Sequence, residues 1–517
     1  MEKLETGLPN QQALVSAPKN QEENYFTKLT IPCMVYAFFY TVFVFLNPAG
    51  VAVPFFAAGT LYFFYSFIKK YCGSVKKGHV FYAGSILLLA MITCTTQSWV
   101  LILLNRVWMI FLCALWILTM LLGKTDWNIP TYFNGIVKVL FGWGMECGSP
   151  FLDGQKYVSN IRESSNQFKT ERKNNTKQIL VGFAIGFLML VFVLMLLGSS
   201  DIFFQEMLGK IGDALLIWEF LNVELAREIV GKICIAVFVF MVAYGSIIRF
   251  IQHKKWSVSI EKQTGKYAAS IAITFSAMIA VVYLFYTFIQ IFGLFMGKLT
   301  LPEGYSYAEY AREGFFQLLI ICLFNIILVI TCTLIYEKNK ILNLILTCIS
   351  LCTFVMVASS AFRMIMYIRE YELTFLRVFV LWALLVIVFV MSGVMVSVYK
   401  TDFSLFRYIV AVITVLYIGF AASHPDYYIV TYNIAQIEKG EDVDLYYLEN
   451  NLSLDATKPL LQYYEDSKQY EDRKYYLRDL EEYVKTEHFY EFNFSKMIAR
   501  NELKQFKERT GVSLIFE

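Results

Sequence analysis

A predicted helix start runs directly into a long apolar segment at residues 304–320, GYSYAEYAREGFFQLLI. The residues Ser306-Tyr307-Ala308-Glu309 have the S-x-x-E spacing of a capping box, in which the serine caps the first turn and the glutamate reaches back to it. Apolar residues then continue to about residue 335, roughly the 20 residues that a helix needs to cross a bilayer. The stretch therefore predicts a membrane-spanning helix whose first turn, rich in tyrosine, lies at the membrane surface.

The whole chain has the composition of a membrane protein. Of its 517 residues, 57% are hydrophobic and 17% are charged, against about 25% charged in a soluble domain. The predicted fold class is an all-α polytopic transmembrane bundle of about 11 spans, with a range of about 10–12. Segment 100–122 is the least regular span, because Asn105 and Arg106 lie within it. The predicted spans are 29–46, 49–68, 79–95, 100–122, 179–198, 230–250, 268–294, 313–335, 341–361, 374–398 and 404–422.

Lysines and arginines in the connecting segments predict the orientation, because cytoplasmic loops are enriched in these residues. They are concentrated in the N-terminal arm and in segments 69–77, 125–177 and 249–266. We therefore expect the N-terminus in the cytoplasm and, after an odd number of spans, residues 424–517 outside. The membrane would be the cytoplasmic (plasma) membrane.

The sequence divides into five predicted parts. The C-terminal part is acidic, with 19 Asp and Glu against 12 Lys and Arg, and its charge pattern predicts a small module of amphipathic helices. Segments 128–147 and 213–228 are predicted to be either interfacial helices or helices packed on the bundle. The parts are a polar arm (1–28), N-terminal membrane helices (29–123), a basic cytoplasmic loop with an interfacial segment (124–178), a core membrane domain (179–423) and the C-terminal module (424–517).

Charged and aromatic residues collect at the predicted outer ends of several spans. Glu309 and Arg312 are three residues apart, within pairing distance on a helix, and Arg363, Tyr367 and Glu370 share a helical face. The candidate polar site consists of Glu309, Arg312, Glu313, Arg363, Tyr367, Glu370, Arg377 and Asp426. Polar residues inside span 268–294, namely Tyr283, Thr287 and Gln290, run toward the same side. The alternative interpretation is a set of separate helix caps, aromatic anchors and arginines that extend to the surface.

Three of these stretches resemble motifs of a known family. YAEYAREGFFQL (307–318), then Thr374, Leu376 and Arg377, and then Asp426, Tyr432 and Asn433 are similar, in this order, to motifs of a family of uncharacterised bacterial multi-pass membrane proteins. The family is the domain of unknown function 4153, with its close relative 4173. The resemblance extends over roughly residues 179–505, with Glu372 where the family usually has glycine. It implies an integral membrane protein of bacteria and no established activity.

No motif identifies a reaction. The sequence has no H-E-x-x-H, P-loop or G-x-S-x-G pattern and no C-x-x-C pair, so we expect no catalytic residue, no cofactor and no metal site. The leading interpretation is a regulatory, sensory or scaffolding envelope protein with an outward-facing polar site. The alternatives are a secondary transporter of a small or amphipathic solute and a lipid-directed transferase that uses Glu309, Glu313 and Asp426.

The expected partners are membrane lipids and envelope or signalling proteins. Nucleic acid is not expected, because the basic stretch 156–177 is explained by topology and by attraction to anionic lipid headgroups.

Overall fold

The computed structural model describes residues 25–45, 47–72, 80–122, 129–165, 223–252, 265, 267–292, 307–400, 402–485 and 489–512. At 307–314 only the backbone is described. These parts of the chain form helices and no named strand, and nine of their helices are long and apolar enough to cross a membrane. The predicted all-helical membrane bundle is therefore confirmed. The chain forms two compact units, residues 1–38 with 143–248 and residues 39–142 with 249–517.

The nine helices coincide with nine of the predicted spans. Predicted span 79–95 is the helix α3 (Val80–Thr93), whose 14 residues are apolar but short for a bilayer. Predicted span 179–198 lies outside the described residues, as does most of segment 213–228.

Predicted span 100–122, which contains the polar residues Asn105 and Arg106, is the continuous helix α4 (Trp99–Leu122). Its Asn105 is fully buried and hydrogen-bonded on both sides. The Nδ2 atom donates to Thr93 Oγ1 at 3.0 Å, and Oδ1 accepts from the Tyr417 hydroxyl at 2.7 Å. Arg106 donates to the backbone oxygen of Val44 at 3.1 Å. Both polar residues therefore link α4 to its neighbours instead of ending the helix.

The first unit contains α1 (Phe26–Phe39), α6 (Ser149–Ser165) and α9 (Val223–Gln252). On α9, the Tyr244 hydroxyl donates to Asp153 Oδ2 of α6 at 2.9 Å. The ring of Phe26 lies 5.6 Å from that of Tyr157. A Cβ atom at Gly154 would come within 3.0 Å of the Phe26 ring, so glycine permits the close packing of α1 on α6.

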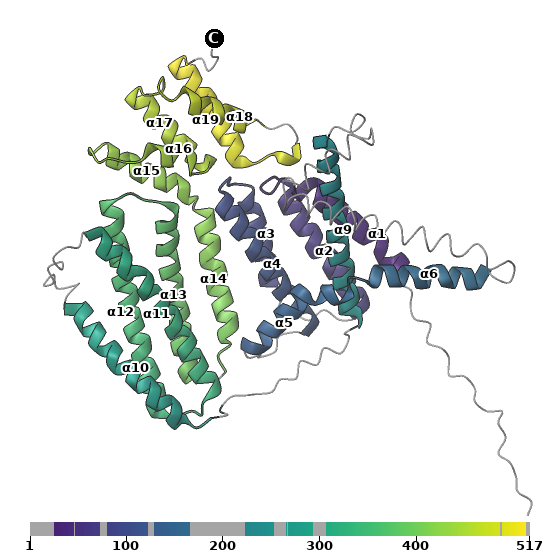
Figure 1. Cartoon of the computed structure of the whole chain (residues 1–517), viewed down its shortest axis with the longest axis horizontal. Helices are drawn as coiled ribbons and strands as arrows, with labels where there is room; N and C mark the ends of the chain where they lie inside the picture. The colour runs from purple at the N-terminus through teal and green to yellow at the C-terminus, as the bar shows by residue number, and fades with distance from the viewer. Residues whose placement is uncertain are drawn as a thin grey trace, which may run out of the picture. The chain divides into compact units, whose positions relative to one another are not determined.

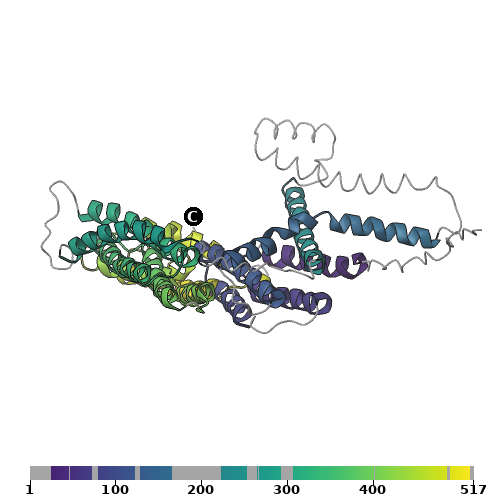
Figure 2. The same ribbon diagram turned by 90° about the horizontal axis from the view of Figure 1, so that it is seen from below.

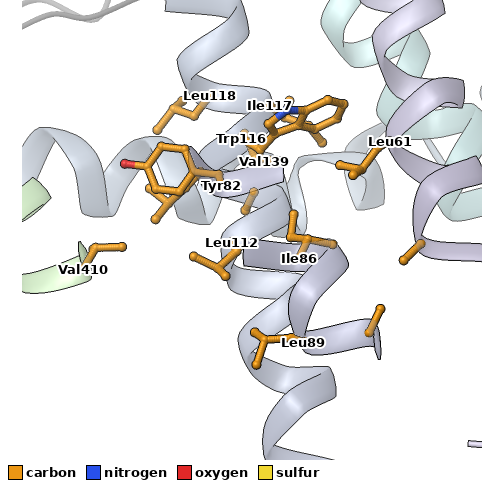
Figure 3. Packing of buried hydrophobic residues seen from close by; sticks show 14 of the residues in the cluster. Leu61, Tyr82, Ile86, Leu89, Leu112, Trp116, Ile117, Leu118, Val139 and Val410 are labelled. Atoms are coloured by element: carbon orange, nitrogen blue, oxygen red, sulfur yellow. The ribbon is translucent and has the colours of Figure 1, made fainter. Parts of the chain in front are cut away.

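The second unit begins with the π-helical turn η1 (Tyr40–Phe45) and the helices α2 (Ala52–Cys72), α3, α4 and α5 (Ile129–Phe141). These helices and α14 (Leu405–Ala422) enclose one apolar cluster, in which Tyr82, Leu112, Trp116 and Val410 come together (Figure 3). The cluster joins elements more than 300 positions apart, so α3 and α4 belong to the same bundle as the C-terminal spans.

Helix α5 occupies most of segment 128–147 and packs on the bundle. Its buried face packs on α4, where a Cβ atom at Gly135 would approach the Leu118 side chain to 2.9 Å. The Tyr132 hydroxyl accepts a hydrogen bond from Arg407 Nε at 3.0 Å. Phe133 and Phe141 on the other face are exposed. The segment is therefore a helix packed on the bundle, with an aromatic outer face.

The remaining spans form a layer of neighbouring helices. They are α10 (Ala269–Gln290), α11 (Tyr307–Ile335), α12 (Lys340–Glu370), α13 (Phe375–Tyr399) and α14. Figures 1 and 2 both show them side by side. Helix α11 is described from Tyr307 onward. Residues 293–306, including the capping-box residue Ser306, lie outside the described residues, so the predicted helix start stays a prediction.

The C-terminal module has a hydrophobic core of its own. That core contains Leu460, Tyr464, Leu477, Leu503 and Phe506, all at most 3% exposed. The amphipathic helices that the charge pattern predicts are present. They are α15 (Pro425–Ile437), α16 (Leu445–Asn450), η5 (Leu454–Ala456), α17 (Thr457–Ser467), α18 (Lys474–Tyr483), η6 (Phe489–Glu491) and α19 (Phe494–Thr510).

Candidate functional site

Two of the predicted site residues, Arg377 and Asp426, lie at a junction between the bundle and the C-terminal module. Figure 1 shows the module above the ends of α12, α13 and α14. Tyr447 of α16 accepts a hydrogen bond at its hydroxyl oxygen from the Phe375 backbone N–H at 3.1 Å, and Asn433 of α15 bonds to the backbone of Leu373. The turn between α12 and α13 is therefore held by the module.

Arg377 and Tyr367, both predicted site residues, are in direct contact. The Arg377 guanidinium lies 4.3 Å from the centroid of the Tyr367 ring and 5.8 Å from that of Tyr371. It also donates to the backbone carbonyl of Glu372. Cation–π contacts of this kind stabilise by about 0.5–2 kcal/mol, most when desolvated. Arg377 thus connects the start of α13 to the end of α12 and to the turn between them.

Arg363 and Glu370 lie on the same helix at different depths. The 31 residues of α12 extend about 46 Å at 1.5 Å per residue, whereas the hydrocarbon core is about 30 Å thick. Glu370 ends the helix and is exposed, whereas Arg363, two turns earlier, is 6% exposed. Helix α12 therefore buries Arg363 within the bundle, whereas Glu370 lies at its exposed end.

Glu309, Arg312 and Glu313 are on the first two turns of α11. Their side chains lie outside the described residues, so their pairing with Arg363 stays a prediction. The backbone places these turns at the start of a helix that packs along α12 and α13.

A second set of polar residues, centred on Asp455, joins the module to the loop between α3 and α4. Asp455 Oδ2 accepts hydrogen bonds from the Thr96 hydroxyl at 2.6 Å and from His424 Nδ1 at 3.0 Å. Its Oδ1 accepts from the hydroxyl of Ser495. The Asp455 side chain is 4% exposed and that of His424 33% exposed. One carboxylate thus links the α3–α4 loop, the start of α15 and the start of α19.

Asn493, the N-cap of α19, fastens the module to two loops of the bundle. Its Oδ1 accepts from the Ser495 backbone N–H at 2.8 Å. Its Nδ2 donates to the backbone oxygen of Ala49 at 2.7 Å and to that of Thr96 at 3.1 Å. Because Asn493 is 1% exposed, no water competes for these bonds.

Asp426, the last of the predicted site residues, is buried in the first turn of α15, within the module. It is 2% exposed, and its Oδ2 accepts from the Ser453 backbone N–H at 3.1 Å and from the Ser453 hydroxyl at 2.6 Å. His424, two residues earlier, has a φ of 50°, a left-handed conformation in which histidine is enriched. This turn before Pro425 directs α15 away from α14.

Three ionisable groups at the junction hold protons more strongly than they do in water. The hydrogen bond to Asp455 raises the pKa of His424, against an opposing effect of burial. Burial raises the pKa of Asp426, although hydrogen bonds from Ser453 and Ser98 oppose it. Burial likewise raises the pKa of Glu372. All three shifts have the same sign, so docking of the module favours proton uptake.

A polar track runs through the membrane between α10, α11 and α12. The Tyr283 hydroxyl donates to Asn325 Oδ1 at 2.8 Å, and Asn325 Nδ2 donates to Thr353 Oγ1 at 2.9 Å. Nearer the module, the Ser359 hydroxyl donates to Gln290 Oε1 at 2.8 Å. Two members of the stripe predicted from the sequence, Tyr283 and Gln290, therefore meet polar partners on neighbouring helices.

Sequence reasoning missed the residues that complete the junction, namely Thr96, Asp455, Asn493 and Ser495. Only Asn493 carries a local signal, since Asn followed by a helical pattern predicts an N-cap. The others are ordinary polar residues whose partners are distant in sequence. Among the described residues, no three His, Cys, Asp or Glu side chains are arranged to hold a metal ion.

These features define an integral membrane protein, a polytopic helical bundle with a helical extramembrane module fastened to one end. The chain belongs to the family described as domain of unknown function (DUF4153), whose family model matches residues 83–463. The match begins earlier than the expected limit of 179, which agrees with the packing of α3 and α4 against α14, and it ends earlier than 505. No curated protein matches the chain, and no solved structure matches it.

Proposed function

We propose that the chain is a regulatory or sensory protein of the bacterial cytoplasmic membrane, with its C-terminal module on the outer side as the sensing element. The observation that carries this proposal is the buried junction around Asp455, where a titratable histidine and two carboxylates lie between the module and the ends of the spans. A signal that alters this junction acts on the module and on the helix ends together.

Two sets of hydrogen bonds connect the module to the ends of the membrane helices. Through Thr96 and Ala49 the module bonds to loops that begin α4 and α2. Through Asn433 and Tyr447 it bonds to the turn that begins α13. Because buried hydrogen-bonding groups are costly to leave unpaired, a displaced module forces these loops to rearrange. A sensor requires an element with two arrangements, and we propose that the docked and the displaced module are these two arrangements.

The test is deletion of the gene followed by envelope-stress and antimicrobial phenotyping. The deletion strain is complemented with the whole chain, with Asp455→Asn and, as a control, with Asp479→Asn, an exposed residue of the same module. We expect Asp455→Asn to reach the membrane at a normal level and to fail to restore the stress response. Full complementation by Asp455→Asn would contradict the sensing role of the junction.

One observation favours a secondary transporter as the second candidate. The polar track from Tyr283 through Asn325 to Thr353 lies inside the membrane, where interhelical hydrogen bonds commonly serve as packing contacts and also mark solute pathways. A deletion phenotype confined to one solute would favour transport. An altered profile of lipid or wall precursors would favour the lipid-directed transferase, for which Asp426 is the only candidate carboxylate with a described side chain, and it is buried.

A further inference from the structure

The C-terminal module exposes a compact group of large apolar side chains at the point where it meets the bundle. We define this apolar foot as Tyr483, Phe489, Phe494, Met497 and Ile498, all exposed. They come from the end of α18, from η6 and from the first turns of α19. Beyond Ile498, the exposed residues of α19 are polar or charged, among them Arg500, Asn501 and Lys504. Along α19, the exposed apolar side chains are thus confined to the first turns, at the end of the helix that touches the bundle.

Backbone contacts place the foot at the level of the helix ends. The Phe494 N–H donates to the oxygen of Cys94 at 2.9 Å, and the Val51 N–H donates to the oxygen of Phe492 at 2.8 Å. Cys94 directly follows α3 and Val51 directly precedes α2. Figure 1 shows the yellow segment before α19 beside the ends of these two helices.

The same level carries exposed aromatic residues of the bundle itself. The apolar segments Ala52–Tyr71 and Trp99–Leu121 contain 20 and 23 residues, about 30 and 35 Å of helix, which matches the roughly 30 Å hydrocarbon core. Their first turns therefore lie at the membrane interface, where Phe55 and Trp99 are 73% and 71% exposed. Trp and Tyr are enriched at this depth, and Phe is common on the apolar face of interfacial helices. Phe489 is 83% exposed.

We propose that the apolar foot inserts into the interfacial region of the bilayer that the spans cross, so that the module is anchored to lipid as well as to protein. Basic side chains flank the foot, with the Lys496 ammonium 5.1 Å from the Tyr483 ring centroid and Arg500 exposed beside it. Such an arrangement of apolar residues with basic neighbours is typical of interfacial helices. The module as a whole is acidic, so insertion of apolar surface, and not net charge, supplies the attraction.

A second copy of the chain fits the foot less well. Stable protein interfaces use about 20–30 residues on each side, whereas the foot offers five side chains at one end of one module. Its position next to the first turns of α2 and α4 is continuous with the lipid-facing surface of the bundle. Both features favour the bilayer as the occupant.

The experiment is site-specific photo-crosslinking in the full-length chain, reconstituted in nanodiscs of phosphatidylethanolamine and phosphatidylglycerol. The photoreactive residue p-benzoylphenylalanine replaces Phe489 or Phe494. The matched control replaces Tyr475, which is 67% exposed near the opposite end of α18. After irradiation, peptides are examined by mass spectrometry for lipid adducts and for adducts between chains.

We expect lipid adducts to be several-fold more abundant at positions 489 and 494 than at 475, and to persist at high salt because apolar insertion is not screened. Adduct levels equal to those at Tyr475 would overturn the proposal. Adducts between two chains at these positions, or lipid adducts lost at high salt, would overturn it as well. Because the substituted positions are exposed, folding of the chain is expected to be unaffected.

Discussion

The carboxamide of Asn433 pairs with both backbone groups of Leu373. Oδ1 accepts from the Leu373 N–H at 2.9 Å, and Nδ2 donates to the Leu373 oxygen at 2.9 Å. The asparagine is fully buried in α15, and Leu373 lies in the turn between two membrane helices. One side chain of the module therefore replaces the backbone pairing that this turn lacks.

Asn433→Ala should destabilise the chain markedly. The change leaves the partly buried N–H and oxygen of Leu373 without their partner, and a fully buried group of this kind costs about 1–3 kcal/mol. Thermal unfolding in detergent measures the effect. Thr431→Ala on the exposed face of the same helix is the control, and should change the stability by no more than about 0.5 kcal/mol. Equal shifts for the two variants would show that the Asn433 pairing contributes little.

Docking of the module should weaken as the pH rises. The folded-state pKa of His424 is raised, so its contribution is fully present below the unfolded value of about 6.5 and is lost as the pH passes through the folded value. The raised pKa values of Asp426 and Glu372 act with the same sign, starting from lower unfolded values. Hydrogen exchange of residues 94–98 and 453–456 between about pH 6 and about pH 9, corrected for the intrinsic rate, should show declining protection.

The variant His424→Asn distinguishes the contribution of His424 to the pH dependence from the contributions of Asp426 and Glu372. Asparagine tolerates the left-handed φ of 50° and can donate a hydrogen bond to Asp455, but it does not titrate. The variant should lose the pH dependence above about pH 6 while the protection at one fixed pH stays near that of the parent. An unchanged pH profile in His424→Asn would exclude His424 as the titrating group.

Glu309 and Arg363 should be energetically coupled. Arginine at mid-depth costs about 2.5–3.5 kcal/mol on insertion scales, and Arg363 is buried near the end of its span, so an acidic partner on the neighbouring α11 is favoured. A double-mutant cycle with Glu309→Gln and Arg363→Gln, followed by thermal unfolding in detergent, measures the interaction. A coupling above about 0.5 kcal/mol would support one polar site, whereas additive losses would mean that the two side chains do not meet.

The N-terminus and the C-terminal module should lie on opposite sides of the membrane. This prediction rests on the concentration of Lys and Arg in alternate connecting segments and on the eleven predicted spans. Reporter fusions after residues 75, 170 and 260 should be active in the cytoplasm, and a fusion after residue 430 should be active outside. Cytoplasmic activity at 430 would require a different number of spans.

The sequence by itself determined the membrane helices. Hydropathy over about 20 residues is a local property, so nine predicted spans coincide with helices. The sequence also indicated that Arg377, Tyr367 and Asp426 belong to one region, because each lies near the end of a span on one predicted side.

Only the tertiary structure decided what these residues contact. Asp455 meets Thr96 across 359 positions, Asn493 meets Ala49 across 444, and Tyr417 meets Asn105 across 312. No periodicity or spacing records such pairs, because each depends on how the helices pack and not on the residues beside it in the chain. For the same reason, the structure changed the interpretation of Asn105, which is an irregularity in a hydropathy plot and a hydrogen-bonded link between three helices in the folded bundle.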